Sequence, residues 1–336
     1  MPTLESIKAA ALGVALTNKG PESQKYDEYL KNLKDQLAQN GDSIVGEPIP
    51  FYKEGVKSPA GYVIETNNQV MVCYHGTQFG KVFGSGGTEI RHDLQTEQVN
   101  MQFGDQQLGV HKGFKAEYDA SKESLYAALK KVDTSKGVSI SGHSLGGAVA
   151  QIAALDATAN PKDPPIKINE VVTFGGPRVL SNEAAAEYNK LRLSEKTMRI
   201  KQKWDPVPRL VPKSKNYAHV GNKISVDAGT NSVHSGSVYR KIGKKVLNED
   251  HVKNARSSDE PVTMETYLDI VMRVTKEQFA AAIKSVNGAI NIAHEYLSKN
   301  TKLVGKMIAG FMNRANTVPT TTVTPNQQTS RDSLSH

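Results

Sequence analysis

The sequence predicts an α/β protein with a mostly parallel sheet, and two observations support this fold class. Short runs rich in β-branched residues, such as residues 138–141 and 170–174, have the composition of buried strands. Between them lie longer stretches with helical spacing, such as residues 114–132, where Phe114, Tyr118, Leu125 and Leu129 fall on one side. Strands that alternate with helices in this way favour a parallel sheet flanked by helices.

The N-terminal third is expected to begin with helices and continue with a hairpin. Residues 1–39 have helical character, and the apolar run 9–16 follows a single lysine, Lys8, which favours a packed helix over a signal peptide. Residues 61–66 and 69–74 flank the pair Asn67-Asn68, a typical hairpin signal. Further strands are predicted at 138–141, 170–174, 198–203 and 223–226.

The pattern changes near residue 264, which divides the chain into three predicted parts. Residues 1–263 form the α/β domain. Residues 264–315 repeat apolar side chains at three- and four-residue spacing beside lysines, which predicts a helical C-terminal extension. Residues 316–336 are rich in Thr, Ser, Gln and Pro, so they are expected to be disordered.

Composition limits the class of protein and its partners. Lys and Arg exceed Asp and Glu by 42 − 34 = 8 in 336 residues, a balance that suits an anionic partner. The chain has no nucleic-acid-binding motif, which leaves a lipid surface as the expected partner.

The single cysteine, Cys73, rules out an internal disulfide, and no run approaches the ~18 apolar residues of a membrane span. We expect a soluble or membrane-peripheral protein, cytoplasmic or exported without a recognisable signal peptide.

Residues 142–146, Gly-His-Ser-Leu-Gly, carry the strongest chemical signal. The strand before them must turn sharply into a helix that begins near Leu145, which exposes the hydroxyl of Ser144 on a strained turn. Side chains would collide in such a turn, so Gly142 and Gly146 remove the Cβ at the crowded positions. The pattern indicates a nucleophilic serine.

A serine hydrolase also needs a base, a carboxylate and donors for the oxyanion. Asp205 directly follows a predicted strand and comes after Ser144 in the chain, as the order Ser, Asp, His requires. His251 is the preferred base because it precedes a turn-rich loop that leads into the next helix, and His234 is the alternative. The oxyanion donors are expected to be the N–H of Leu145 and a group at Thr77.

Six blocks in the same order give the chain a resemblance to the class 3 lipases, the fungal-lipase-like branch of the α/β-hydrolase fold. The blocks are residues 74–77, 93–94, 110–114, 142–147, 173–179 and 205–208. The resemblance implies that Asp205 is the acid of the triad and Thr77 the oxyanion residue, and that His111 and His143 have packing roles. The family's histidine block, which has an aromatic residue a few positions on, has no clean match, and Tyr267 is one candidate for that aromatic residue.

The segment between the first two blocks predicts a lid. Residues 79–94 combine Phe79, Val82, Phe83 and Ile90 with several glycines, which predicts an apolar flap over the site. The expected function is a serine carboxylester hydrolase for lipids, of the triacylglycerol lipase or phospholipase A type, without metal or organic cofactor. It would act at an anionic membrane surface, with a protein partner for the C-terminal helices as a further option. The alternatives are a catalytically silent membrane- or protein-binding module on the same fold and an esterase for small soluble esters.

Overall fold

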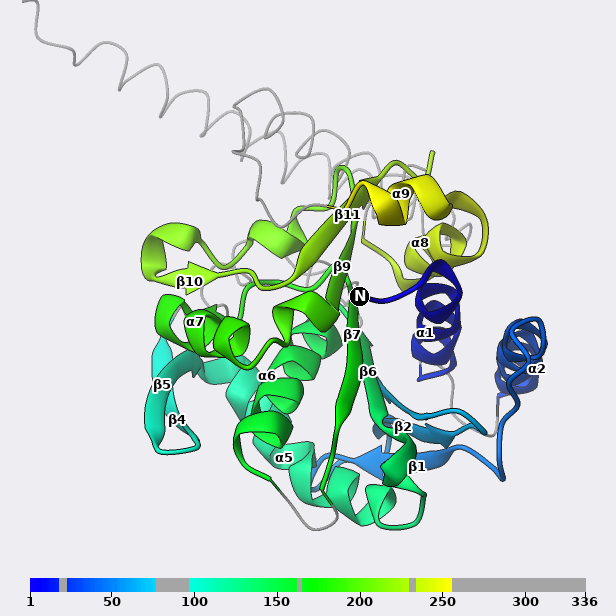
Figure 1. The fold of residues 1–336 in the computed structure, drawn as a ribbon, viewed down its shortest axis with the longest axis horizontal. Coiled ribbons are helices and arrows are strands. Elements are labelled where there is room, and N and C mark those ends of the chain that lie inside the picture. Colours follow the sequence, from blue (N-terminus) through cyan, green and yellow to red (C-terminus); the bar gives the residue numbers. More distant parts are fainter. Residues whose placement is uncertain (18–22, 77–96, 162–164, 230–233, 256–336) are drawn as a thin grey trace, which may run out of the picture. The chain divides into compact units, whose positions relative to one another are not determined.

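A computed structural model describes residues 1–17, 23–76, 97–161, 165–229 and 234–255 (Figure 1). Its main sheet has seven strands in the order β1-β2-β3-β6-β7-β9-β11. These strands are β1 (Ile49–Tyr52), β2 (Pro59–Glu65), β3 (Val70–Tyr74), β6 (Val138–His143), β7 (Ile168–Phe174), β9 (Thr197–Gln202) and β11 (Asn222–Val226). Pairing is parallel from β3 to β11 and antiparallel from β1 to β3. The predicted mostly parallel sheet is confirmed.

The register of the strands sets up one functional edge. Gly61 of β2 lies opposite Tyr74 of β3, Tyr74 opposite Gly142 of β6, and Gly142 opposite Thr173 of β7. The parallel strands therefore end at the same level, and the loops that follow them leave the sheet side by side. We refer to this edge as the carboxyl edge. The predicted hairpin is also confirmed, since β2 and β3 are joined through Asn67 and Asn68.

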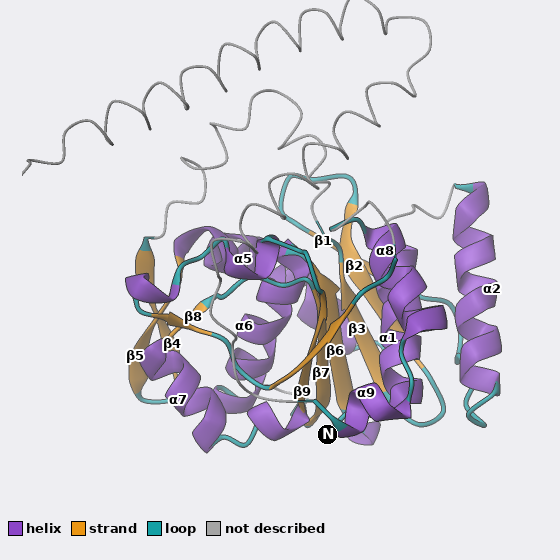
Figure 2. Ribbon diagram, turned by 90° about the horizontal axis from the view of Figure 1, so that it is seen from above, coloured by secondary structure: helices purple, strands orange, loops and turns teal. Residues whose placement is uncertain are grey.

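Helices cover both faces of the sheet, as Figure 2 shows. One face packs against α5 (Lys112–Leu129) and α6 (Leu145–Ala159), and the other against α1 (Leu4–Thr17), with α2 (Gln24–Ala38) and α8 (Gly236–Lys241) in the same apolar cluster. Strand β3 shows the alternation that makes this possible. Val70 and Val72 enter the first cluster, whereas Met71 and Cys73 enter the second.

Helix α1 is apolar on nearly all sides from Ala9 onward, and this part of the helix is enclosed. Eleven of its 14 residues are buried, and it packs between the sheet, α2 and α8. At Gly13 a Cβ would come within 2.6 Å of the Cys73 sulfur, so the helix approaches β3 closely. The predicted packed helix at residues 9–16 is confirmed. In the described part of the chain, every helix is too short or too polar to cross a bilayer.

A second, antiparallel sheet lies beside the first and was not predicted. Its order is β10-β8-β5-β4, from the strands β4 (Gln98–Phe103), β5 (Gln106–His111), β8 (Leu180–Ser181) and β10 (Tyr217–Ala218). The remaining helical segments are α7 (Asn182–Lys190), α9 (Glu249–Lys253), the π-helix η5 (Ile242–Val246), and the 3-10 helices η1 (Thr134–Lys136), η2 (Ser194–Lys196), η3 (Val207–Arg209) and η4 (Lys213–Lys215). Two-residue strands such as β8 and β10 carry no periodicity that a sequence pattern could detect.

Several predictions concern residues outside the described ranges. These are the lid at 79–94, the helical extension at 264–315, the tail at 316–336 and the boundary at 263. They stay predictions.

His111 ends β5 and is buried against aromatic rings. Its side chain is 2% exposed, and its ring stacks on Phe114 with a centroid distance of 4.3 Å. Burial lowers the pKa of His111 to about 4. The imidazole is therefore neutral in the folded protein at ordinary pH, which agrees with the packing role that the resemblance implies.

This buried histidine predicts a pH-dependent stability. Because the unfolded chain binds the proton near pH 6.5 and the folded chain only near pH 4, the free energy of unfolding should fall as the pH drops between those values. Urea unfolding at pH 7 and pH 4.5 should show that the wild type loses about 2–3 kcal/mol more than a His111→Gln variant. The control is His251→Gln, at a partly exposed histidine, which should follow the wild type. Identical pH profiles for wild type and His111→Gln would contradict the argument.

Candidate active site

The turn from β6 into α6 places Ser144 in a conformation that only close packing can hold. Ser144 has φ 56° and ψ −124°, an uncommon region for a residue with a side chain. A Cβ on Gly142 would come within 2.2 Å of the Gly146 carbonyl oxygen, and one on Gly146 within 2.5 Å of the His75 carbonyl oxygen. The Ser144 amide donates to the Phe174 carbonyl at 2.8 Å, which fixes the turn to β7. The predicted requirement for both glycines is confirmed.

Three side chains form one hydrogen-bonded line at the carboxyl edge. His234 Nε2 lies 2.9 Å from Ser144 Oγ, and His234 Nδ1 lies 2.7 Å from Asp205 Oδ2. Ser144 follows β6, Asp205 follows β9, and His234 lies beyond β11. With Asp205 ionised, Nδ1–H donates to the carboxylate, which leaves Nε2 free to accept the serine proton. This arrangement has the geometry of a nucleophile, a base and an orienting acid.

The carboxylate of Asp205 is fully buried and has a donor for each oxygen. Its Oδ1 accepts the Val207 amide at 2.9 Å, and its Oδ2 accepts both His234 and the Tyr239 hydroxyl. Burial, followed by the charge of Asp205, raises the pKa of Tyr239 well above its usual value, so the phenol stays a donor. Gly175, at φ +61°, leaves the room for this cluster, since a Cβ there would lie 2.7 Å from Asp205 Oδ2.

His143 packs against His234. Its ring stacks on His234 with centroids 4.9 Å apart and leans on Tyr239 at 5.2 Å. Burial, followed by the nearby His234, lowers the pKa of His143 well below its usual value, so this imidazole is neutral. Its position agrees with the expected packing role, and its partner is the ring of His234.

The preference for His251 as the base is wrong in this structure. His251 lies on α9 with its Nδ1 2.6 Å from Asn248 Oδ1, and it faces a shallow groove lined by Lys223 and Ile224 at the start of β11. The start of β11 is at the edge of the sheet opposite Ser144. The loop that begins after β11 already reaches the carboxyl edge, where His234 lies beside Ser144. Helix α8 and η5 follow, and α9 then lies beside the start of β11 at the opposite edge of the sheet.

One signal in the sequence could have identified His234. The resemblance calls for an aromatic residue a few positions after the base, and Tyr239 lies five positions after His234 and touches Asp205. Tyr267, the candidate paired with His251, lies outside the described residues.

The groups proposed for the oxyanion are described only in part. Leu145 is the first residue of α6, and the first amides of a helix have no acceptor within it. Thr77 lies just beyond the described residues, so its role stays a prediction. The residue before it, Gly76, passes close to the turn at residues 142–146, which we call the elbow, since a Cβ on Gly76 would come within 2.6 Å of the His143 carbonyl oxygen.

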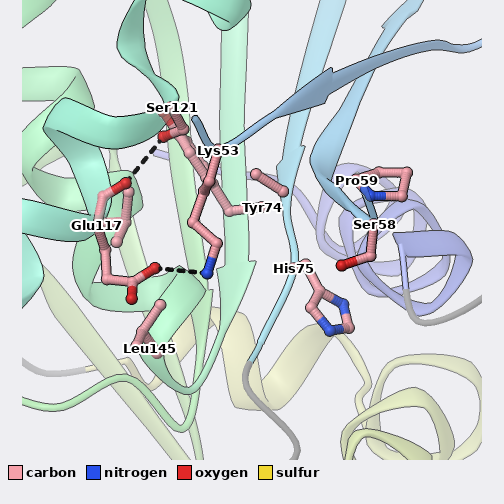
Figure 3. Close-up of a pocket in the computed structure, with 10 residues that line it drawn as sticks. Lys53, Ser58, Pro59, Tyr74, His75, Glu117, Ser121 and Leu145 are labelled. Atoms are coloured by element: carbon pink, nitrogen blue, oxygen red, sulfur yellow. Dashed lines mark hydrogen bonds and ion pairs between the residues drawn. The ribbon is translucent and has the colours of Figure 1, made fainter. Parts of the chain in front are cut away.

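A small cavity of about 50 Å³, lined by both polar and apolar side chains, lies beside the turn from β6 into α6 (Figure 3). Leu145 and His75 line it, together with Lys53, whose ammonium lies 3.0 Å from Glu117 of α5. Burial, followed by the charge of Lys53, lowers the pKa of His75. Among the described residues, no group of three or more His, Cys, Asp or Glu side chains is placed to hold a metal ion.

The comparisons with known proteins agree with the resemblance. Residues 73–215 match the family model of class 3 lipases. A secreted mono- and diacylglycerol lipase of Fusarium solani is 31% identical over 134 residues, which are 36% of this chain and 35% of that protein. A lipase of Rhizopus niveus is 31% identical over 194 residues, 56% of this chain and 47% of that protein. The chain therefore spans about a third to a half of the length of these curated relatives.

A solved structure supports the fold. The mono- and diacylglycerol lipase of Aspergillus oryzae superposes with a TM-score of 0.50 at 18% identity, over 70% of this chain and 84% of that one. With its mostly parallel sheet and flanking helices, the chain has the α/β-hydrolase fold, as expected.

A substitution at Gly146 should separate the elbow from β3. In Gly146→Ala the new methyl would meet the carbonyl oxygens of His75 and Tyr74 at 2.5 and 2.9 Å, and these backbone atoms cannot rotate away. We expect a loss of about 1–3 kcal/mol in the free energy of unfolding and a large fall in kcat/KM on a soluble ester. Gly113→Ala is the matched control, because its nearest neighbour would be at an ordinary 3.5 Å. Equal behaviour of the two variants would refute the packing argument.

Proposed function

Because residues 73–215 of this chain match the family model of class 3 lipases, we propose that the protein is a serine carboxylester hydrolase that acts on lipids. The observation that carries the proposal is the position of His234, whose two ring nitrogens lie within 2.9 Å of Ser144 Oγ and 2.7 Å of Asp205 Oδ2. A histidine that is solvated or only packs in the core is not expected to contact both a serine with a strained backbone and a buried carboxylate.

The reaction would proceed through an acyl-enzyme. Ser144 Oγ attacks the ester carbonyl while His234 Nε2 takes the serine proton, and the carbonyl oxygen becomes an oxyanion that the Leu145 amide stabilises, with Thr77 as the second donor. His234 then gives the proton to the departing alcohol as the C–O bond breaks. Water, deprotonated by His234, attacks the acyl-serine, and the fatty acid leaves as Ser144 Oγ takes the proton back.

The surroundings of His234 suit both of its protonation states. The buried carboxylate of Asp205 stabilises the imidazolium that forms in each half of the reaction. The Val207 amide and the Tyr239 hydroxyl keep that carboxylate in place. The neutral ring of His143 supports the plane of His234 without adding a competing positive charge.

The substrate class is proposed from the relatives and from charge. One of the relatives reported above is named as a mono- and diacylglycerol lipase, and the other is named only as a lipase. The net charge of +8 favours action at an anionic lipid surface, which makes phospholipids a second group of candidate substrates.

Alanine variants of Ser144 and His234 test the mechanism, with His251→Ala as the matched control. Ser144→Ala and His234→Ala should each lower kcat/KM on a soluble short-chain ester by about 10⁴–10⁶-fold, because each removes a group that acts on the reacting atoms. His251→Ala should leave the rate unchanged, since His251 contacts Asn248 far from Ser144. A fluorophosphonate probe should label the wild type and fail to label Ser144→Ala. Activity that survives His234→Ala but not His251→Ala would overturn the assignment.

Two measurements of substrate preference test the lipid part of the proposal. The rate on long-chain esters should increase when the substrate passes its aggregation threshold, whereas an esterase for soluble substrates would show saturation below it. Incubation with a mixture of glycerides and phospholipids, followed by mass spectrometry, should show which lipid loses an acyl chain. Ser144→Ala is the control, and the same products from that variant would contradict the proposal.

A further inference from the structure

The turn between β1 and β2, residues 53–58, lies at the same edge of the sheet as Ser144. Tyr52 at the end of β1 pairs with Pro59 at the start of β2, and Gly61 of β2 lies level with Tyr74 of β3 and with Gly142 of β6. Since neighbouring strands are about 4.8 Å apart, the turn is about 10–15 Å from the nucleophile along this edge.

This turn exposes apolar side chains beside a cation. Tyr52 is 38% exposed and Val56 41%, and Lys57 follows Val56 on the surface. The other large apolar side chains with comparable exposure among the described residues are Met1 and Val45. A tyrosine, an aliphatic side chain and a lysine together match the lipid–water boundary, where rings and methyl groups enter the apolar region and the ammonium meets headgroups.

Three contacts with α5 hold Tyr52 and the turn in place. The Tyr52 amide donates to Ser124 Oγ at 2.9 Å, and the Glu54 amide donates to the Ala120 carbonyl at 2.9 Å. The ion pair between Lys53 and Glu117 adds a third tie. A braced turn keeps its apolar side chains outward, so little conformational freedom is lost when they contact a surface.

The turn and the elbow also share one cavity. Ser58 and Pro59 lie on one side of it, Leu145, which follows Ser144, lies on the other, and the Lys53 side chain extends to Glu117 on the side of Leu145 (Figure 3). A surface that touches the turn is therefore continuous with the surroundings of Ser144.

We propose that Tyr52 and the turn 53–58 form a docking surface for lipid, with Tyr52 and Val56 inserted at the boundary and Lys57 facing anionic headgroups. The inference rests on the proposed lipid hydrolysis. The residues of this surface lie outside the predicted lid at 79–94. The net charge of +8 makes an anionic lipid surface the complementary partner.

Binding to vesicles tests this surface independently of hydrolysis. The full chain carrying Ser144→Ala would be mixed with sedimentable vesicles of phosphatidylcholine, alone or with phosphatidylglycerol. Adding Val56→Asp should weaken the partition coefficient about tenfold on both kinds of vesicle, because a carboxylate at the boundary replaces an inserted side chain. The matched control is Val45→Asp, at a valine of 42% exposure that lies beside Glu65 at the opposite end of β2.

Two charge changes test the headgroup contact in opposite directions. Lys57→Glu should weaken binding to the anionic vesicles by roughly tenfold and leave phosphatidylcholine binding unchanged, whereas Glu54→Lys should strengthen anionic binding by a similar factor. Lys131→Glu, an exposed lysine that follows α5 at the opposite edge, is the control. Circular dichroism melting identifies any variant that fails to fold, and Val56→Thr, which keeps the shape, should give an intermediate loss.

The outcomes separate this proposal from the proposed function. Equal binding by Val56→Asp and Val45→Asp, or no binding by the parent protein, would overturn the docking surface while leaving hydrolysis of a soluble ester as an independent result. A Lys57→Glu variant that binds anionic vesicles as tightly as the parent would overturn the headgroup contact.

Discussion

Ser144 has a backbone conformation that costs about 1–3 kcal/mol for a residue with a side chain, and the packing around it must supply that energy. The backbones of β3, β6 and α6 meet there without side chains between them, because Gly142 and Gly146 have none. The amide of Ser144 is fixed to β7 by its bond to Phe174. Both the direction of the serine hydroxyl and the distance from α6 to the His75–Gly76 segment follow from this contact.

The second constraint is electrostatic, and it depends on burial. Asp205 is 0% exposed, and a buried carboxylate is costly unless donors surround it. Val207, Tyr239 and His234 supply those donors, and they come from three different parts of the chain. The carboxylate thereby connects the loop after β9 to α8 and to the loop that carries the base. The Asp205 carboxylate therefore has two roles. It must have hydrogen-bond donors because it is buried, and in the proposed mechanism it orients the imidazole of His234.

The sequence allowed prediction of those features that depend on local pattern. The elbow, the hairpin around Asn67 and Asn68 and the strand before Asp205 are all defined by neighbours within a few residues, and the structure has them where they were expected. The histidine beside Ser144 and Asp205 was not identified in this way, although the aromatic residue five positions after His234 was a local signal. Its identity depends on how far the chain travels after β11 before it turns back, and the choice between His234 and His251 was a choice between two edges of the sheet.

Two strands of the second sheet were missed for a related reason, whereas its six-residue strands β4 and β5 form a local hairpin that was overlooked. Strands β8 and β10 are two residues long and exist only through their pairing with distant partners, Leu180 with Ala218 and Leu180 with Val110. The exposed turn after Tyr52 was also invisible in the sequence, because exposure at a given edge is a property of the assembled sheet.

The position of β11 has a consequence for how activity would be lost. Within the described sheet β11 is one of the two edge strands and pairs with β9 alone, yet the loop after it carries His234. Outer strands open at lower free energy than strands that are paired on both sides. Fraying of this single strand would withdraw His234, the proposed base, from Ser144 while β3, β6 and β7 remain folded. Inactivation on heating is therefore expected to precede the cooperative melting of the domain.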